Sequence, residues 1–149
     1  MIIRKIEAKG TGKQTAELEF SKGLNVVAGA SNTGKSYVVQ CIDFILGGTK
    51  PPKTIDESKG YEYIEVTFEE DDGRQFSLQR KLGVNAEIVM RESGSDKAIV
   101  LKGKHKPGFN NLSNHFLRKI GLNDKLLLKS KENLTTQALT VRTLEKIFI

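Results

Sequence analysis

The eight residues GASNTGKS, at positions 29–36, constrain this chain more than any other stretch. They match the pattern G-x-x-x-x-G-K-[ST] without a mismatch. The apolar run LNVVA precedes them at 24–28, and apolar residues at helical spacing follow until the glycine pair at 47–48. A strand, a glycine loop and a helix in this order predict a phosphate-binding loop (P-loop, or Walker A motif) in an α/β fold.

Each residue type in this loop has a physical reason to be there. Gly29 and Gly34 let the backbone bend so that successive N–H groups point at a phosphate. The helix that begins next adds the positive end of its dipole. Lys35 is predicted to contact the β- and γ-phosphates as the catalytic residue, and the Ser36 hydroxyl to bind Mg²⁺. The predicted cofactors are ATP and Mg²⁺, and the predicted nucleotide-binding residues are Gly29, Ala30, Ser31, Asn32, Thr33, Gly34, Lys35, Ser36 and Tyr37.

The rest of the chain supplies mostly short strands. Alternating apolar and polar residues predict strands over 2–8 and 15–20, and the covered strand over 24–28. Two antiparallel hairpins are expected to turn at Asp72-Gly73 and Ser93-Gly94. Amphipathic helices are expected from Asn111 to Gly121 and after Thr140. We therefore expect a mixed sheet around the P-loop helix, with an antiparallel β-subdomain beside it.

Chain length and composition favour one domain. The 149 residues, 38% of them hydrophobic, suffice for a single core over 1–149. Apolar residues still recur at helical spacing in the last predicted helix when the sequence ends at Ile149. We therefore expect this chain to be the N-terminal part of a longer polypeptide. No run of eighteen apolar residues occurs, which predicts a cytoplasmic protein without membrane contact. The lone Cys41 falls in the apolar helical pattern and is expected to be a buried thiol.

A carboxylate for hydrolysis is harder to find. A P-loop ATPase also needs an apolar strand that ends in a carboxylate, which holds Mg²⁺ through water. The candidate is Glu69–Asp72, but the strict alternation before it is typical of a half-exposed hairpin strand. We therefore expect this chain to bind ATP without efficient turnover, while the complete protein hydrolyses it.

These motifs resemble a known family. The order MIIRKIEA, TAELEFSKGLNVVAG, the P-loop and a helix ending IDFILGG is similar to the N-terminal lobe of the Rad50, SbcC and SMC group of ABC-type ATPases. The resemblance is specific over 1–48 and looser over 61–101. Ser31 before Asn32, and Tyr37 after Ser36, depart from the usual pattern and suggest a divergent branch.

The resemblance implies an ATPase in DNA repair, genome maintenance or defence against foreign DNA. In such ATPases a glutamine reaches the Mg²⁺, and Gln137 resembles it, although an exposed loop glutamine is an equally good interpretation. Two heads of the family sandwich ATP in a head-to-head dimer. The signature segment and later carboxylates have no counterpart here, so the resemblance implies a C-terminal half or a partner chain.

The net charge of +6 and a pI near 9.4 favour a polyanionic partner. The basic residues contain few interleaved aromatic residues, so sequence-independent contact with duplex DNA is the functional alternative to a merely solvated face. The residues concerned are Lys102 to Lys106, Arg118, Lys119, Lys125, Lys129 and Lys131.

Two other functions remain open from the sequence. The chain could be a self-contained, nucleotide-gated binding module without catalysis. It could also be a small P-loop kinase, which would need an arginine-rich lid. Of the six residues RKLGVN that follow the second hairpin strand, only Arg80 could serve such a lid.

Overall fold

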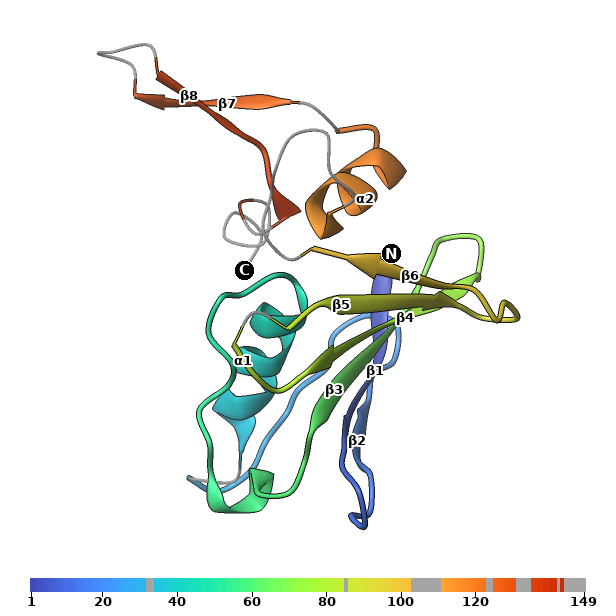
Figure 1. Cartoon of the computed structure of the whole chain (residues 1–149), viewed down its shortest axis with the longest axis vertical. Coiled ribbons are helices and arrows are strands. Elements are labelled where there is room, and N and C mark those ends of the chain that lie inside the picture. The colour runs from blue at the N-terminus through green and yellow to red at the C-terminus, as the bar shows by residue number, and fades with distance from the viewer. Residues whose placement is uncertain are drawn as a thin grey trace.

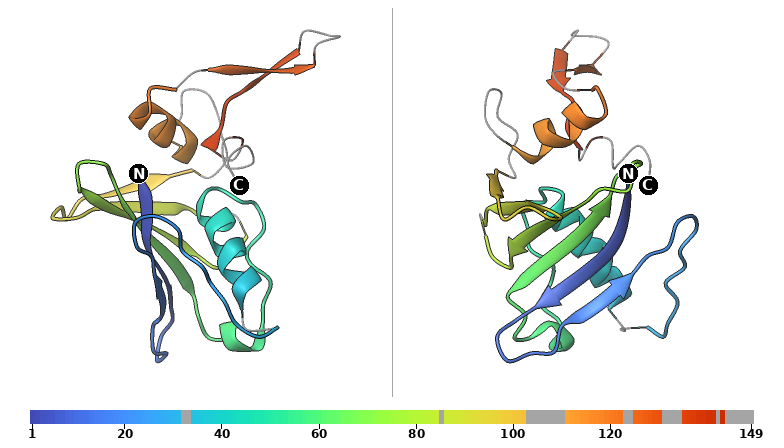
Figure 2. Two further views of the ribbon diagram at one scale, coloured as in Figure 1. Left: turned by 180° about the vertical axis from the view of Figure 1, so that it is seen from behind. Right: turned by 90° about the vertical axis from the view of Figure 1, so that its right-hand side faces the viewer.

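A six-stranded antiparallel sheet is the framework of the molecule. We describe residues 1–31, 34–84, 86–102, 111–122, 125–130, 135–141 and 143 of a computed structural model. The sheet has the order β2-β1-β3-β4-β5-β6, and α1 covers one of its faces (Figures 1 and 2). The strands are β1 (Ile2–Lys9), β2 (Ala16–Glu19), β3 (Tyr63–Glu69), β4 (Gln75–Lys81), β5 (Ile88–Glu92) and β6 (Ala98–Leu101).

Period-two patterning places the core on the face under α1. Ile64, Val66 and Phe68 of β3 are buried in alternation, and β4 repeats the pattern with Phe76 and Leu78. The opposite face carries charges, including an ion pair of 2.7 Å between Lys9 Nζ and Glu65 Oε2. Both hairpins form at the expected turns, because Gly73 and Gly94 supply the positive φ angles.

The helix α1 (Lys35–Ile45) follows the glycine loop and ends before Gly47 and Gly48, as the sequence predicts. Its sheet-facing side buries Cys41, Phe44 and Ile45. Burial raises the pKa of the Cys41 thiol to about 12, so Cys41 is the buried, protonated residue that was expected. The chain then passes through the short 3₁₀ helix η1 (Asp56–Ser58) into β3.

The second helix, α2 (Leu112–Lys119), packs on the same face of the sheet as α1. Its Asn111 cap accepts a hydrogen bond from Asn114 N at 2.9 Å, as an N-cap should. The Phe116 ring contacts Phe68 and Phe76 edge to face, with centroids 5.6 and 5.8 Å away. Beyond α2, the strands β7 (Leu126–Ser130) and β8 (Thr135–Ala138) form a separate two-stranded sheet.

The structure corrects two expectations. Residues 24–28 lie outside every strand, and the side chains of Leu24 and Val26 are 92% and 78% exposed. All pairs between named strands are antiparallel, so the parallel component of the expected mixed sheet is missing from the described residues. Both differences have one reason: a strand needs a neighbour for its backbone, and no described strand lies beside 24–28. The expected helix after Thr140 falls mostly outside the described residues, although Thr143 N donates to Thr140 Oγ1.

Candidate nucleotide-binding site

Gly34 sets the geometry where the glycine loop enters α1. It is the N-cap, with φ 82° and ψ 5°, a left-handed conformation that costs a side-chain-bearing residue roughly 1–2 kcal/mol. The helix starts at once with a hydrogen bond of 3.2 Å from Val38 N to Gly34 O. Gly34 itself has no side chain with which to cap the first turn. The positive end of the helix is therefore presented to the loop, as anion binding requires.

Lys35 turns back into the loop. Its ammonium donates to Gly29 O at 2.9 Å and also to Ala30 O. Two backbone carbonyls thus hold the positive charge at the mouth of the loop, next to the start of α1. Of the other predicted loop residues, Ser31 and Ser36 are exposed, while Asn32 and Thr33 lie outside the described residues.

A cleft of about 710 Å³ opens in front of these residues. Its volume falls within the usual range for ligand sites. One wall is the loop and the first turns of α1, including Lys35, Ser36 and Tyr37. The predicted residues that the structure brings together here are Ser31, Gly34, Lys35, Ser36 and Tyr37.

The opposite wall was not predicted from the sequence. It is the segment 53–57, which lies over α1 because Gln40 Oε1 accepts a hydrogen bond of 2.8 Å from Lys53 N. This wall adds the charges of Lys53, Asp56 and Glu57 to the cleft, and Asp56 pairs with Lys59 at 2.6 Å. Nothing in residue spacing shows that a loop after a helix folds back over its first turns.

Other candidates for metal contact lie away from the cleft. Gln137 is exposed on β8, paired with Leu127, and β8 lies at the opposite end of the molecule from the start of α1 (Figure 1). Glu69 ends β3 and pairs with Arg4 at 3.1 Å and Lys22 at 3.5 Å. Among the described residues, no three His, Cys, Asp or Glu side chains are grouped so that they could hold a metal ion.

The basic residues suggested for DNA contact do not all face solvent as free cations. Lys119 forms an ion pair with Glu70, and its ammonium lies 4.8 Å from the centroid of the Phe76 ring. Arg118 and Lys125 are exposed. Residues 103–106 and Lys131 lie outside the described part of the chain. No helix in the described part of the chain is both long enough and apolar enough to cross a bilayer.

Comparison with known proteins identifies the family. The model of the AAA domain family matches residues 3–147. The chromosome partition protein Smc of Thermoplasma acidophilum is 30% identical over 96 residues, covering 57% of this chain and 8% of that protein. The DNA double-strand break repair Rad50 ATPase of Nanoarchaeum equitans is 30% identical over 127 residues, covering 81% and 16%. The DNA repair protein RecN of Aquifex aeolicus is 33% identical over 120 residues, covering 74% and 22%.

The aligned part of this chain therefore spans less than a quarter of the length of each of these relatives. The antiparallel sheet, α1 and the glycine loop all fall within the matched residues. The chain belongs to the AAA domain family and corresponds to the N-terminal region of an SMC- and Rad50-like ATPase head.

Proposed function

We propose that this chain is the ATP-binding lobe of an ATPase that acts on DNA in repair, chromosome maintenance or defence against foreign DNA. The observation that carries the proposal is the arrangement at the start of α1. The N-terminus of α1, its left-handed cap residue Gly34 and the Lys35 ammonium meet at one end of a cleft of about 710 Å³. This combination is suited to a polyphosphate.

In this proposal Lys35 exchanges its carbonyl partners for the β- and γ-phosphates of ATP. The exchange is favourable because a hydrogen bond between two charged groups is stronger than one to a neutral carbonyl. The N–H groups of the loop and of the first turn of α1 hold the β-phosphate. The exposed Ser36 hydroxyl binds Mg²⁺, which supplies positive charge to the phosphoryl oxygens.

Hydrolysis is proposed to need a second part, from the same polypeptide or a partner chain. Two observations support this. The described residues include no group of three His, Cys, Asp or Glu side chains that could hold a metal ion, and the segment before the loop is apolar and exposed. Leu24, Val26 and Val39 are 92%, 78% and 65% exposed, which is unusual for apolar side chains so near a binding site. A strand laid beside 24–28 would cover Leu24 and Val26.

The remaining partners follow from the same assignment. Two copies would form a head-to-head dimer, and Gln137 would reach Mg²⁺ only if β7 and β8 move when the second part is present. Non-specific DNA is proposed to bind the exposed basic residues, with Arg118 and Lys125 as the described candidates. The proposal places the protein in the cytoplasm.

Titration of the chain with MgATP, by isothermal calorimetry, tests the proposal. The Lys35→Ala variant should lose at least about tenfold in affinity, because a charge-assisted hydrogen bond contributes roughly 1.5–3 kcal/mol. Lys50→Ala is the matched control, since Lys50 is exposed and does not line the cleft. Equal affinities for Lys35→Ala and wild type would contradict the P-loop assignment.

Phosphate release from MgATP tests the proposal that hydrolysis needs a second part besides this chain. We expect no turnover by this chain at saturating MgATP. Turnover that is linear in protein and lost in Lys35→Ala would show that a catalytic carboxylate lies within the 149 residues.

A further inference from the structure

The wall 53–57 of the cleft is held by α1, the helix that contributes to the other wall. Lys53 N donates a hydrogen bond of 2.8 Å to the side-chain oxygen Oε1 of Gln40, on the second turn of α1. Gln40 follows Ser36 by four residues, so the two side chains lie on the same face of the helix, and both line the cleft. The bond therefore joins the wall to the face of α1 that also carries the predicted Mg²⁺ ligand.

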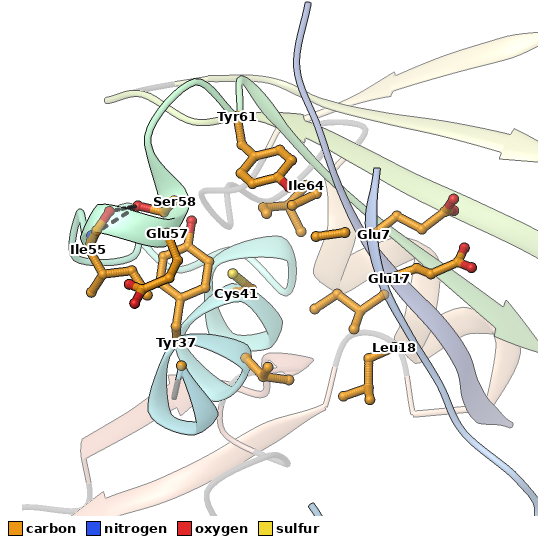
Figure 3. Close-up of a pocket in the computed structure, with 15 residues that line it drawn as sticks. Glu7, Glu17, Leu18, Tyr37, Cys41, Ile55, Glu57, Ser58, Tyr61 and Ile64 are labelled. Carbon is orange, nitrogen blue, oxygen red and sulfur yellow. Dashed lines mark hydrogen bonds between the residues drawn. The ribbon is translucent and has the colours of Figure 1, made fainter. Parts of the chain in front are cut away.

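Contacts at its C-terminal end also fix the wall. Directly after it, Ser58 forms a side-chain hydrogen bond with the Tyr37 hydroxyl of α1. Ser58 Oγ also donates to Ile55 O at 2.8 Å and accepts from Ile55 N at 2.9 Å, and Figure 3 shows these two bonds beside the Tyr37 ring. This end of the wall is therefore held both by its own turn and by α1.

The N-terminal end of the wall depends on Gln40. Pro52, directly before it, is buried, whereas Lys53 and Thr54 are exposed. Proline has no backbone N–H group, so Lys53 offers the first one after Pro51 and Pro52. Removal of the Gln40 oxygen would therefore release this end of the wall and leave the end at Ser58 attached.

A fixed wall favours ligand binding in the cleft of about 710 Å³. The wall reaches the start of α1, because Ile55 Cδ1 lies 3.9 Å from the position of a Cβ on Gly34. If 53–57 had to be ordered when a ligand arrives, the lost conformational freedom would oppose binding. A wall that is already in place avoids this cost, and most of the gain in affinity appears as slower dissociation.

We propose that Gln40 is a positioning residue for the nucleotide. Its side-chain oxygen holds the wall 53–57 over the first turns of α1, so that the cleft is formed before the ligand binds. The inference rests on the proposed function, since the ligand is MgATP with its phosphates beside Lys35. Gln40 acts on this ligand through the wall.

Two substitutions of Gln40 separate this role from an effect of charge. Gln40→Met has a similar length and no oxygen, so it removes the acceptor. Gln40→Glu keeps an acceptor but adds a negative charge to the cleft. Repulsion of the phosphates alone would make Gln40→Glu the weaker binder, whereas the positioning role makes Gln40→Met the weaker one. Gln75→Met is the matched control, because Gln75 is exposed on β4 and does not line the cleft.

Calorimetric titration with MgATP measures these affinities. We expect Gln40→Met to bind about three- to tenfold more weakly than wild type, as for the loss of one neutral hydrogen bond. Gln40→Glu should bind more tightly than Gln40→Met, and Gln75→Met should bind as wild type does. Equal affinities of Gln40→Met and wild type, or weaker binding by Gln40→Glu than by Gln40→Met, would overturn the proposal.

Amide hydrogen exchange, followed by NMR without nucleotide, tests the attachment of the wall itself. The Lys53 N–H group should exchange faster in Gln40→Met than in wild type and should remain protected in Gln40→Glu. Unchanged exchange at Lys53 in Gln40→Met would also overturn the proposal, because other contacts would then hold the wall.

The titrations distinguish this proposal from the proposed function. If MgATP does not bind to the wild type, or binds equally well to Lys35→Ala, the P-loop assignment fails, and the role of Gln40 fails with it. If Lys35→Ala binds MgATP more weakly while Gln40→Met binds it as wild type does, only the role of Gln40 is overturned.

Discussion

The two ends of α1 differ in how the protein satisfies their terminal backbone groups. At its C-terminal end, carbonyl groups are bound by a buried side chain from β4, Arg80, which is 4% exposed. Arg80 Nη1 donates to Phe44 O at 2.5 Å and to Gly48 O at 2.8 Å, and Nε donates to Ala86 O at 3.0 Å. At the N-terminal end the cap residue is Gly34, which has no side chain, and the Lys35 ammonium donates hydrogen bonds to exposed loop carbonyls.

The C-terminal end of α1 thus supports the fold, whereas its N-terminal end is the candidate site for a ligand. The Arg80 guanidinium also lies 4.0 Å from the centroid of the Phe44 ring, and its charge complements the negative end of the helix dipole. Among the described residues no carboxylate pairs with it, so the helix end itself is its partner. At the C-terminal end the carbonyl groups are bound by Arg80 of the same domain. At the N-terminal end the positive potential of the helix remains available to an anion from outside the chain.

The largest expected effect on stability is at the C-terminal end of α1. Arg80→Met should lower the free energy of unfolding by about 3 kcal/mol or more, because three carbonyl oxygens lose their donor. Urea unfolding followed by circular dichroism measures this. Arg91→Met is the control, since Arg91 is exposed and donates a hydrogen bond of 3.2 Å to the Gln79 side chain. A similar loss of unfolding free energy in both variants would show that Arg80 has no special role at the end of α1.

The N-terminal end of α1 should instead affect stability only when a ligand is bound. MgATP at about 100 times its Kd should stabilise the fold by about 2.7 kcal/mol, since a ligand that binds only the native state shifts the unfolding equilibrium. Thermal unfolding with and without MgATP measures this gain. Lys35→Ala should unfold at the same temperature as wild type without nucleotide and show less gain with it. A Lys35→Ala protein that is less stable without nucleotide would mean that Lys35 supports the fold.

Gly34 should matter to both stability and binding, by a smaller amount. Gly34→Ala places a side chain at φ 82° and should cost roughly 1–2 kcal/mol. The added Cβ would have Ile55 Cδ1 at 3.9 Å, so the cost comes from backbone strain and not from a clash. Calorimetric titration should also show weaker MgATP binding. Gly83→Ala is a control, because no heavy atom lies within 4 Å of its Cβ position and its φ is not positive.

The smallest effect concerns the outer face of the sheet, away from both ends of α1. Burial would raise the pKa of Glu65, but hydrogen bonds from Lys9 and Ser77 and the charges of Lys9 and Arg91 outweigh it, so the pKa lies below its ordinary value. Its contribution to stability is therefore present above the ordinary glutamate pKa and is lost as the pH falls through the lower native value. Unfolding curves from pH 6 down to about 3 should show a smaller loss for Glu65→Gln than for wild type.

The sequence by itself determined the local elements. The match at 29–36 located the loop and α1, and period-two patterning located both hairpins, because these features depend on neighbours along the chain. The helix from Asn111 was likewise predicted from its apolar spacing, and in the structure Asn111 caps α2. The same reasoning identified Lys35 and Ser36 as the residues at the start of the helix, where the structure places them beside the cleft.

Only the tertiary structure decided what lies beside each element. Residues 24–28 have the composition of a covered strand, yet no described strand pairs with them, since composition does not state which neighbour is present. Arg80 was considered for a kinase lid and instead binds the end of α1. The wall formed by 53–57 depends on its contacts with the first turns of α1, and such contacts leave no period in the sequence.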